Sequence, residues 1–176
     1  MSNMHIVLIF IFFFNLSYAQ KTIVLDKDNS SITYGARHIL TKWEGINNDI
    51  GGVIVYENTI SKIAISAKLI DFNSGNSGRD LHLLEYMDLL RHPYIKFYSE
   101  KIKFFERTIT FDGELEFYGK KKSLQILATA EENDNEIILK GEFQLIPSEY
   151  FTTLPRFQLI KIENLFNINF SLRFLK

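Results

Sequence analysis

Apolar and polar residues alternate with a period of two along much of the chain. In the last segment, residues 166, 168, 170, 172 and 174 are apolar and the residues between them are polar. Successive side chains of a β-strand point to opposite faces of a sheet, so this pattern predicts strands with one buried face. We expect such strands over residues 22–25, 31–38, 52–56, 63–69, 95–104, 109–117, 124–130, 137–145 and 166–174, separated by turns at 26–30, 47–49, 119–122 and 131–135.

Many strands joined by short turns indicate an all-β domain, either a sandwich or an up-and-down barrel. Gly113 and Gly141 fall on the apolar face of their strands. A glycine on the inner face lets a sheet bend sharply, which a closing barrel requires. The two glycines therefore favour a barrel, although ordinary bulges in a sandwich would also explain them.

One segment breaks the alternation and predicts a short helix over Asp80–Arg91. Its apolar residues 81, 84 and 87 have helical spacing. Asp80 suits the N-cap or first turn, Arg91 suits the C-terminal end, and Pro93 is expected to stop the helix.

The first nineteen residues are typical of a signal peptide. Ile6–Phe14 is an unbroken apolar run, and Ser17 and Ala19 are the small residues that a signal peptidase reads, so we expect cleavage after Ala19. A transmembrane anchor is the alternative, but a spanning helix needs about 20 apolar residues. The expected organisation is a signal peptide over 1–19 and one domain over 20–176, with a periplasmic or secreted location.

Charge and composition exclude several classes of function. The net charge of −1 offers no basic face for nucleic acid. The chain has no cysteine, which excludes disulfides, thiolate metal sites, a cysteine nucleophile and a covalent lipid anchor on cysteine. No catalytic motif is present, and His38, His82 and His92 lack the spacing of metal ligands on one element. We therefore predict no catalytic residue, no metal and no cofactor.

The run Arg79-Asp80-Leu81-His82 is the one distinctive cluster of polar residues. An Arg–Asp pair at a helix start commonly pins the preceding loop through charge-assisted hydrogen bonds. The alternative is that Arg79 and His82, or His38, contact the polar or phosphate head group of a ligand at the mouth of a barrel.

The segment around Arg79–His82, together with the elements on either side of it, resembles the signature of the YceI-like family. The resemblance rests on residues 72–83 with their continuation Pro93–Ser99, and on matching elements at 26–34, at Arg37-His38 with Gly45, at 113–120 and at 141–143 with the last strand. It implies an eight-stranded antiparallel, lipocalin-like barrel that binds a polyisoprenoid or quinone-like lipid in its lumen. The sequence departs from the family after Gly45, where the short polar segment 46–49 stands in the place of an expected aromatic residue.

Such a barrel could hold a long apolar tail by burying it, without any catalytic group. One isoprene unit gives roughly 3–4 kcal/mol at ~0.8 kcal/mol per buried CH₂, whereas association costs about 4–15 kcal/mol. Several units are therefore needed. The alternative is that the inward residues simply fill a solid core. The lumen candidates are the inward-phase residues Tyr34, Phe97, Phe111, Phe117, Ile126, Phe143 and Phe170.

Two other functions stay open at this point. A small outer-membrane barrel, structural or pore-forming, also has alternating strands, but the helix, the final Lys176 and the single Trp43 favour the carrier. An enzyme acting on an apolar substrate in the barrel would need a catalytic group facing the lumen. A homodimer also stays open.

Overall fold

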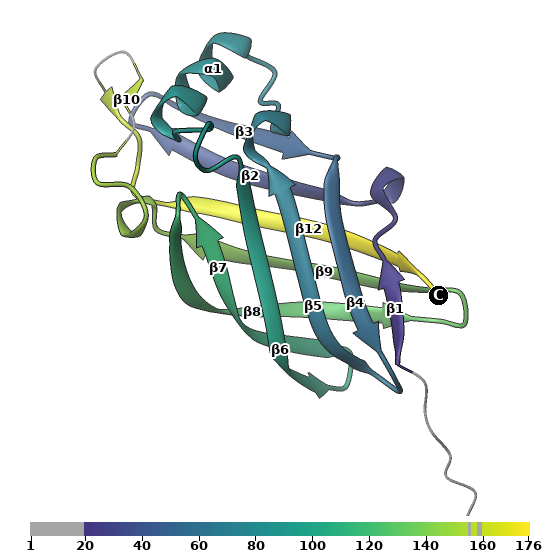
Figure 1. Ribbon diagram of the computed structural model, residues 1–176. Helices are drawn as coiled ribbons and strands as arrows, with labels where there is room; N and C mark the ends of the chain where they lie inside the picture. The colour runs from purple at the N-terminus through teal and green to yellow at the C-terminus, as the bar shows by residue number, and fades with distance from the viewer. Residues whose placement is uncertain (1–19, 155, 158–159) are drawn as a thin grey trace, which may run out of the picture.

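In the part of the chain that the structure describes, the fold is built on one antiparallel sheet of ten strands with a single α-helix (Figure 1). The computed structural model describes residues 20–154, 156–157 and 160–176, so the expected signal peptide lies outside the described residues. The strands of this sheet are β1 Lys21–Val24, β2 Ser31–His38, β3 Thr41–Asn47, β4 Ile50–Tyr56, β5 Ile60–Lys68, β6 Tyr94–Phe105, β7 Thr108–Phe117, β8 Lys120–Glu132, β9 Glu136–Leu145 and β12 Phe166–Leu175. The shorter elements are η1 Lys27–Asn29, η2 Leu69–Asp71, α1 Ser77–Tyr86, η3 Pro147–Glu149 and the hairpin β10 Arg156–Phe157 with β11 Ile160–Lys161.

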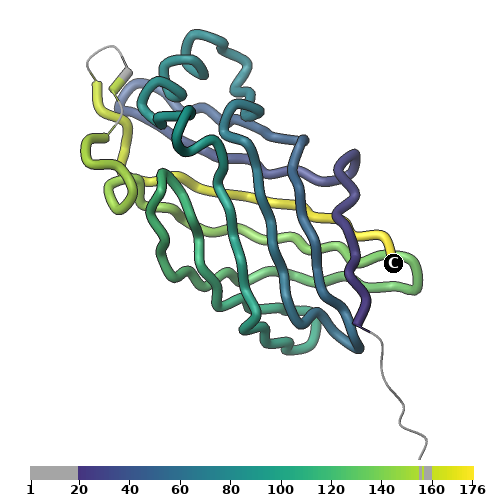
Figure 2. The backbone as a smooth tube through the Cα atoms, in the orientation of Figure 1, coloured from purple at the N-terminus to yellow at the C-terminus, as the bar shows by residue number. Residues whose placement is uncertain are grey.

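The ten strands amount to an eight-stranded barrel, because two long strands are each interrupted once. Neighbours in the sheet follow the order β1-β4-β5-β6-β7-β8-β9-β12-β2-β3. β1 and β2 are consecutive halves of one strand around η1, and β4 and β3 pair with them as halves of the next strand. Figure 2 shows the strands curving round a common interior.

The pairing of β12 with β2 closes the barrel, and backbone contacts at the interruptions add to it. Leu25, just after β1, forms a bridge with Phe174 of β12, and the amide of Asp26 donates to the carbonyl of Arg173 at 2.8 Å. On the other side, Ile46 of β3 exchanges two backbone hydrogen bonds of 3.0 and 2.9 Å with Asn73. The predicted all-β antiparallel barrel is thus confirmed.

A polar cluster holds the seam where β1 passes into β2. The buried Ser30 hydroxyl donates to the Asp26 carbonyl at 2.7 Å and accepts from the Arg173 amide at 2.9 Å. The Arg173 side chain in turn binds Glu136 at 2.5 Å and Asp26 at 3.4 Å. These bonds satisfy backbone and side-chain groups that the interruption would otherwise leave unpaired.

The alternation predicts most strands but not β3. The inward residues of β3 are Trp43, Gly45 and Asn47, which do not form an apolar row, and only the family resemblance around Gly45 points to a hairpin here. The predicted turn at 119–122 is also too long. Tyr118 and Gly119 both have positive φ and form the turn, so the lysines that follow begin β8.

The helix lies earlier in the chain than predicted. It begins after Asn76, whose side chain accepts a hydrogen bond from the Arg79 amide at 2.9 Å, and Asp80 lies in its first turn. It ends at Tyr86 rather than near Pro93. Asp88 has a φ of 40°, outside the helical region, so the remaining predicted turn of helix cannot form. Among the described residues, no helix has both the length and the apolarity that crossing a membrane requires.

Gly113 and Gly141 face inward as predicted, and each makes room for an aromatic ring. A Cβ atom on Gly113 would lie 2.4 Å from the ring of Phe97, and one on Gly141 would lie 2.6 Å from the ring of Phe170. Both would also approach a neighbouring strand's carbonyl oxygen, at 2.5 and 2.8 Å. The absence of a side chain therefore allows close approach inside the curved sheet.

We predict that Gly141→Ala lowers the free energy of unfolding by about 1–3 kcal/mol, because the neighbouring backbone cannot withdraw from the added methyl group. The matched control is Gly35→Ala in β2, where a Cβ atom would meet nothing closer than 3.6 Å. It should change stability by less than about 0.5 kcal/mol. Urea unfolding measures both, and equal midpoints would contradict a role for Gly141 in curvature.

Candidate functional site

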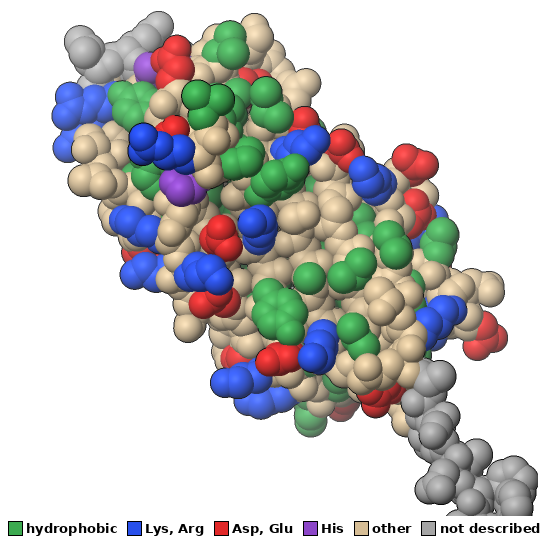
Figure 3. Space-filling model, viewed as in Figure 1, with side chains coloured by type: hydrophobic (Ala, Val, Ile, Leu, Met, Phe, Trp, Pro, Cys, Tyr) green, Lys and Arg blue, Asp and Glu red, His purple; other side chains and the backbone are tan. Residues whose placement is uncertain are grey.

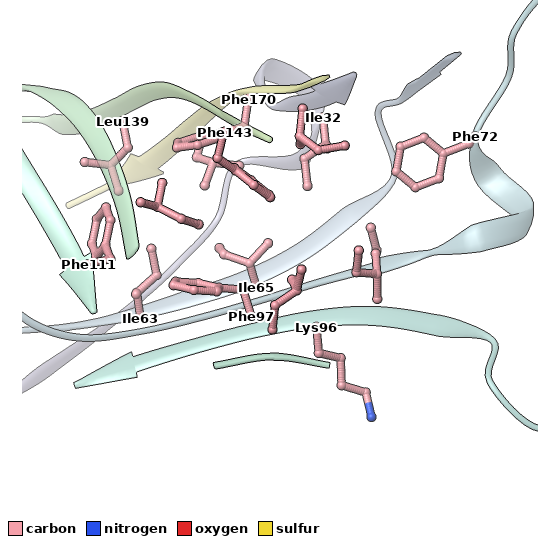
Figure 4. A pocket seen from close by; sticks show the side chains of 16 residues that line it. Ile32, Ile63, Ile65, Phe72, Lys96, Phe97, Phe111, Leu139, Phe143 and Phe170 are labelled. Atoms are coloured by element: carbon pink, nitrogen blue, oxygen red, sulfur yellow. The ribbon is translucent and has the colours of Figure 1, made fainter. Parts of the chain in front are cut away.

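A cavity of about 90 Å³ lies in the middle of the barrel (Figure 4). Ile65 of β5 points across it toward Phe143 of β9 and Phe170 of β12. The lining is apolar except for Lys96, whose ammonium group points away and pairs with Glu116 at 3.8 Å. Five predicted lumen residues lie here: Phe97, Phe111, Ile126, Phe143 and Phe170.

A second cavity of about 50 Å³ continues from the first toward α1. Phe72, Ile95 and Ile168 line both cavities, so these side chains form the partition between them. The other two predicted lumen residues, Tyr34 and Phe117, line this second cavity. All seven predicted residues thus face the barrel interior, and their role in binding a ligand stays a prediction.

A third cavity of about 20 Å³ lies at the α1 end of the barrel. Tyr34, Leu83 and Phe166 line both this cavity and the second one, so the three spaces follow one another from the barrel centre to the end where α1 and β10 lie (Figure 1). Arg79 and His82, two of the predicted head-group residues, line the third cavity.

Arg79 and Asp80 both hold the loop that precedes α1. The Arg79 guanidinium donates to the hydroxyl and to the carbonyl of Ser74, both at 2.9 Å. The Ser74 hydroxyl and amide in turn donate to the Asp80 carboxylate at 2.5 and 3.1 Å. The loop-pinning interpretation of this cluster therefore matches the contacts, with Ser74 as the shared partner.

Arg79 also faces the barrel end. Its guanidinium carbon lies 5.2 Å from the centroid of the Trp43 ring, a cation–π distance. One side chain thus links the loop, the helix and β3.

His82 ties α1 to the β10 hairpin. Its Nε2 lies 2.5 Å from the carbonyl oxygen of Arg156, which places a proton on Nε2. Its Nδ1 lies 3.4 Å from the Glu85 carboxylate.

His38 lies elsewhere, at the end of β2, and is absent from the lining of all three cavities. Its ring packs 5.6 Å from that of Trp43, and its Nδ1 accepts from the Leu40 amide at 3.0 Å. The structure therefore brings Arg79 and His82 together but not His38.

Trp43 and Phe72 line the cavities without being predicted. Phe72 follows η2 and precedes α1, so strand periodicity says nothing about where its side chain points. Trp43 is the single tryptophan of the chain, but the side of the sheet that it faces can be assigned only when β3 is known to be a strand.

The polar atoms near the third cavity are unusual. Tyr34 Oη and Trp43 Nε1 are buried and form no hydrogen bond of standard geometry, and Asp71 Oδ2 is the one other such side-chain atom among the described residues. Burial is the main cause that raises the pKa of the Tyr34 phenol, followed by the charge of Asp80, while hydrogen bonding from the nearby Trp43 indole and the charge of Arg79 lower it. The phenol therefore stays neutral at physiological pH.

The described residues contain no group of three or more histidine, aspartate or glutamate side chains that could hold a metal ion. The arrangement that they do contain is an apolar interior with a polar end. Such a site suits an amphiphile whose tail lies in the barrel.

Comparison with protein families finds a match to the YceI-like domain over residues 24–174. No curated protein sequence matches the chain. The fold is similar to that of BcnA from Burkholderia cenocepacia, at 15% identity and a TM-score of 0.75 over 85% of this chain and 98% of that one. It is also similar to a polyisoprenoid binding domain from Saccharophagus degradans implicated in plant cell wall breakdown, at 10% identity and a TM-score of 0.71 over 87% and 97% of the two chains.

A YceI protein from Campylobacter jejuni shares the fold as well, at 19% identity and a TM-score of 0.65 over 75% of this chain and 84% of that one. At these identities the likeness concerns the fold alone.

We predict that Arg79→Lys speeds amide hydrogen exchange in residues 73–76 and lowers the free energy of unfolding by about 1–2 kcal/mol, because lysine cannot reproduce the forked contact to Ser74. The control is Arg91→Lys, whose side chain is 80% exposed and pairs with Asp88 at 3.5 Å. It should change stability by less than about 0.5 kcal/mol. Unchanged exchange in Arg79→Lys would show that the loop does not depend on this contact.

Proposed function

The chain belongs to the YceI-like family, and from this premise we propose that it is a non-catalytic carrier of a polyisoprenoid or similar long amphiphile, held in the barrel lumen. The observation that carries the proposal is the row of three cavities that leads from the apolar barrel centre to the α1 end, where Arg79 and His82 lie. The related fold of a polyisoprenoid binding domain supports the choice of ligand class. A quinone-like lipid meets the same physical requirements.

The lumen must widen to take a long tail. Its central cavity of about 90 Å³ is smaller than the roughly 150 Å³ of an engineered apolar cavity that binds benzene. The partition side chain Phe72 lies on the segment between η2 and α1, not on a strand. Rotation of this ring would join the first two cavities while the strands keep their hydrogen bonds.

Burial of the tail supplies the affinity. At ~0.8 kcal/mol per buried CH₂, a tail of several isoprene units gains enough to exceed the cost of association. The lining side chains offer no charge to the tail, since Lys96 turns its ammonium group outward. This environment favours a hydrocarbon tail and disfavours a polar substrate.

The distribution of charges favours the carrier over an outer-membrane barrel. Outward-facing lysines form cross-strand ion pairs with glutamates, such as Lys62 with Glu100 at 3.2 Å and Lys121 with Glu114 at 3.0 Å. Figure 3 shows charged side chains spread over the visible face. A barrel that faces lipid needs an apolar outer band instead.

The apolar lining also favours a carrier over an enzyme. A barrel enzyme needs an acid, base or nucleophile beside the buried substrate. Apart from Lys96, whose amine points away, the side chains around the central cavity are hydrocarbon only.

We predict that Ala67→Leu weakens lipid binding more than tenfold, because the larger side chain displaces two or three CH₂ groups of the tail at ~0.8 kcal/mol each. Ala67 is 2% exposed and lines the central cavity. The matched control is Ala64→Leu, on the outward face of the same strand, which should bind as the parent does. Mass spectrometry of organic extracts identifies the lipid that each variant retains through purification. Fluorescence titration with a polyene lipid measures the affinity of each variant.

Unfolding curves show whether each variant folds, and the smaller Ala67→Val replaces Ala67→Leu if it does not. If extracts of the parent contain no lipid and both variants bind the polyene lipid equally well, the proposed carrier function is wrong.

We further propose that the protein acts outside the cytoplasm after cleavage behind Ala19. Intact-mass measurement of the protein from the periplasm or medium should then find a chain that begins at Gln20. Ala19→Asp should block processing, because the peptidase needs a small residue there. A full-length chain retained in the cytoplasm would contradict this location.

A further inference from the structure

The hairpin turn between β2 and β3 exposes two adjacent apolar side chains. Ile39 and Leu40 form the two-residue turn, and they are 87% and 76% exposed. Tight hairpin turns are usually made by glycine, asparagine or aspartate, whose backbones suit the reversal and whose side chains do not place apolar surface in water. The needs of the turn therefore do not account for these two residues.

The turn is tied to the wall of the barrel at its α1 end. The Leu40 amide donates to His38 Nδ1 at 3.0 Å, and the centroid of the His38 ring lies 5.6 Å from that of the Trp43 ring. Trp43 lines the third cavity. Figure 1 shows the β2–β3 turn beside the β10 hairpin, at the same end as α1. The exposed apolar pair thus has a fixed place next to the end of the cavity row.

Cations lie on both sides of this turn. Arg37 and Lys42 are direct cross-strand partners, and Lys161 of β11 lines an open groove of about 700 Å³ together with them. Like charges directly opposite each other destabilise a pair of strands. Glu163 relieves this repulsion by pairing with Arg37, and the hydrogen bond from Arg37 is the main cause that lowers the pKa of Glu163.

Two of these cations keep their charge available. Within the described part of the chain, Lys42 and Lys161 form no ion pair, since the one carboxylate of the groove is engaged by Arg37. The single carboxylate of β2 and β3 is Glu44, which lies two residues beyond Lys42 and farther from the turn. The surroundings of the apolar turn are therefore positive.

An apolar turn flanked by free lysines matches the surface of a bilayer that contains anionic lipids. Apolar side chains enter the boundary between head groups and acyl chains, while lysines are attracted to the lipid phosphates. A protein partner fits less well. A stable interface buries about 800 Å² on each partner, and two side chains on a convex turn supply only a small part of that.

We propose that the β2–β3 turn docks the protein on an anionic lipid bilayer, with Ile39 and Leu40 inserted among the lipids and Lys42 and Lys161 against their phosphates. This adds a membrane-binding surface to the proposed carrier and does not depend on which lipid fills the lumen. Docking in this way turns the third cavity toward the membrane, because Trp43 of the same hairpin lines it. A lipid then passes between bilayer and lumen with little exposure to water.

Co-sedimentation with vesicles tests the proposal. The processed protein that begins at Gln20 is used, because the apolar run of residues 6–14 would itself bind lipid. It should bind vesicles of phosphatidylcholine with phosphatidylglycerol at least fivefold more tightly than vesicles of phosphatidylcholine alone, and high salt should abolish the difference. Leu40→Ser should weaken binding about tenfold or more, and Lys42→Gln about fivefold.

Matched controls lie near the β6–β7 turn, at the opposite end of the barrel (Figure 1). Phe105 is 75% exposed, and the Lys103 side chain is 77% exposed. Phe105→Ser and Lys103→Gln should bind both kinds of vesicle as the parent does. Urea midpoints should be equal in all of these variants, because the replaced side chains are exposed.

Leu40→Trp provides a gain of binding that does not depend on losing a contact. Tryptophan suits the membrane interface, so this variant should bind anionic vesicles more tightly than the parent. Ala67→Leu, which fills the lumen, should bind vesicles as the parent does. A failure of docking and a failure of the carrier function are therefore separate results.

Several results would overturn the inference. These are a parent that does not bind anionic vesicles, Leu40→Ser and Leu40→Trp variants that bind as the parent does, or an equal loss of binding in Phe105→Ser. If Leu40→Ser changes the mass of the protein in analytical ultracentrifugation and leaves vesicle binding unchanged, the turn contacts a second copy of the chain and the proposal is wrong.

Discussion

The apolar face of the sheet must be sealed from water, and the rest of the structure depends on how the strands achieve this. A flat sheet would expose its edge strands and half of its hydrophobic surface. Here the strand formed by β1 and β2, and the one formed by β3 and β4, are interrupted midway, and the interruptions bring Leu25 beside Phe174 and Ile46 beside Asn73. The cluster around Arg173 pairs the polar groups at the first interruption.

A barrel closed in this way encloses more space than its aliphatic side chains fill. Large rings such as Phe97 and Phe170 lie against glycines and lean into the interior, leaving cavities between them. Near α1, both Arg79 and Asp80 hold the preceding loop through Ser74, and Arg79 also lines the cavity at this end. The apolar interior and the polar end therefore follow from one architecture, and together they suit an amphiphile better than a purely apolar or purely polar ligand.

Strand periodicity predicts most of this architecture and fails in particular places. It places all seven lumen candidates correctly on the inner face, because a buried row of alternating residues is visible in a single strand. It misses β3, whose inward row of Trp43, Gly45 and Asn47 is not apolar, and so misses Trp43. It also misplaces the helix, because the Asn76 cap and the positive φ of Asp88 decide the ends more strongly than the apolar spacing.

The sequence by itself determined which face of most strands is buried, since the period of two is a local property of each segment. Only the tertiary structure decided that Tyr34 lies over Gly45, that Arg79 reaches the Trp43 ring, and that His38 packs on the same ring but lines none of the three cavities. These contacts depend on the register between strands and on the path of a loop. Register and loop path are set by the closure of the whole barrel, which no single segment encodes.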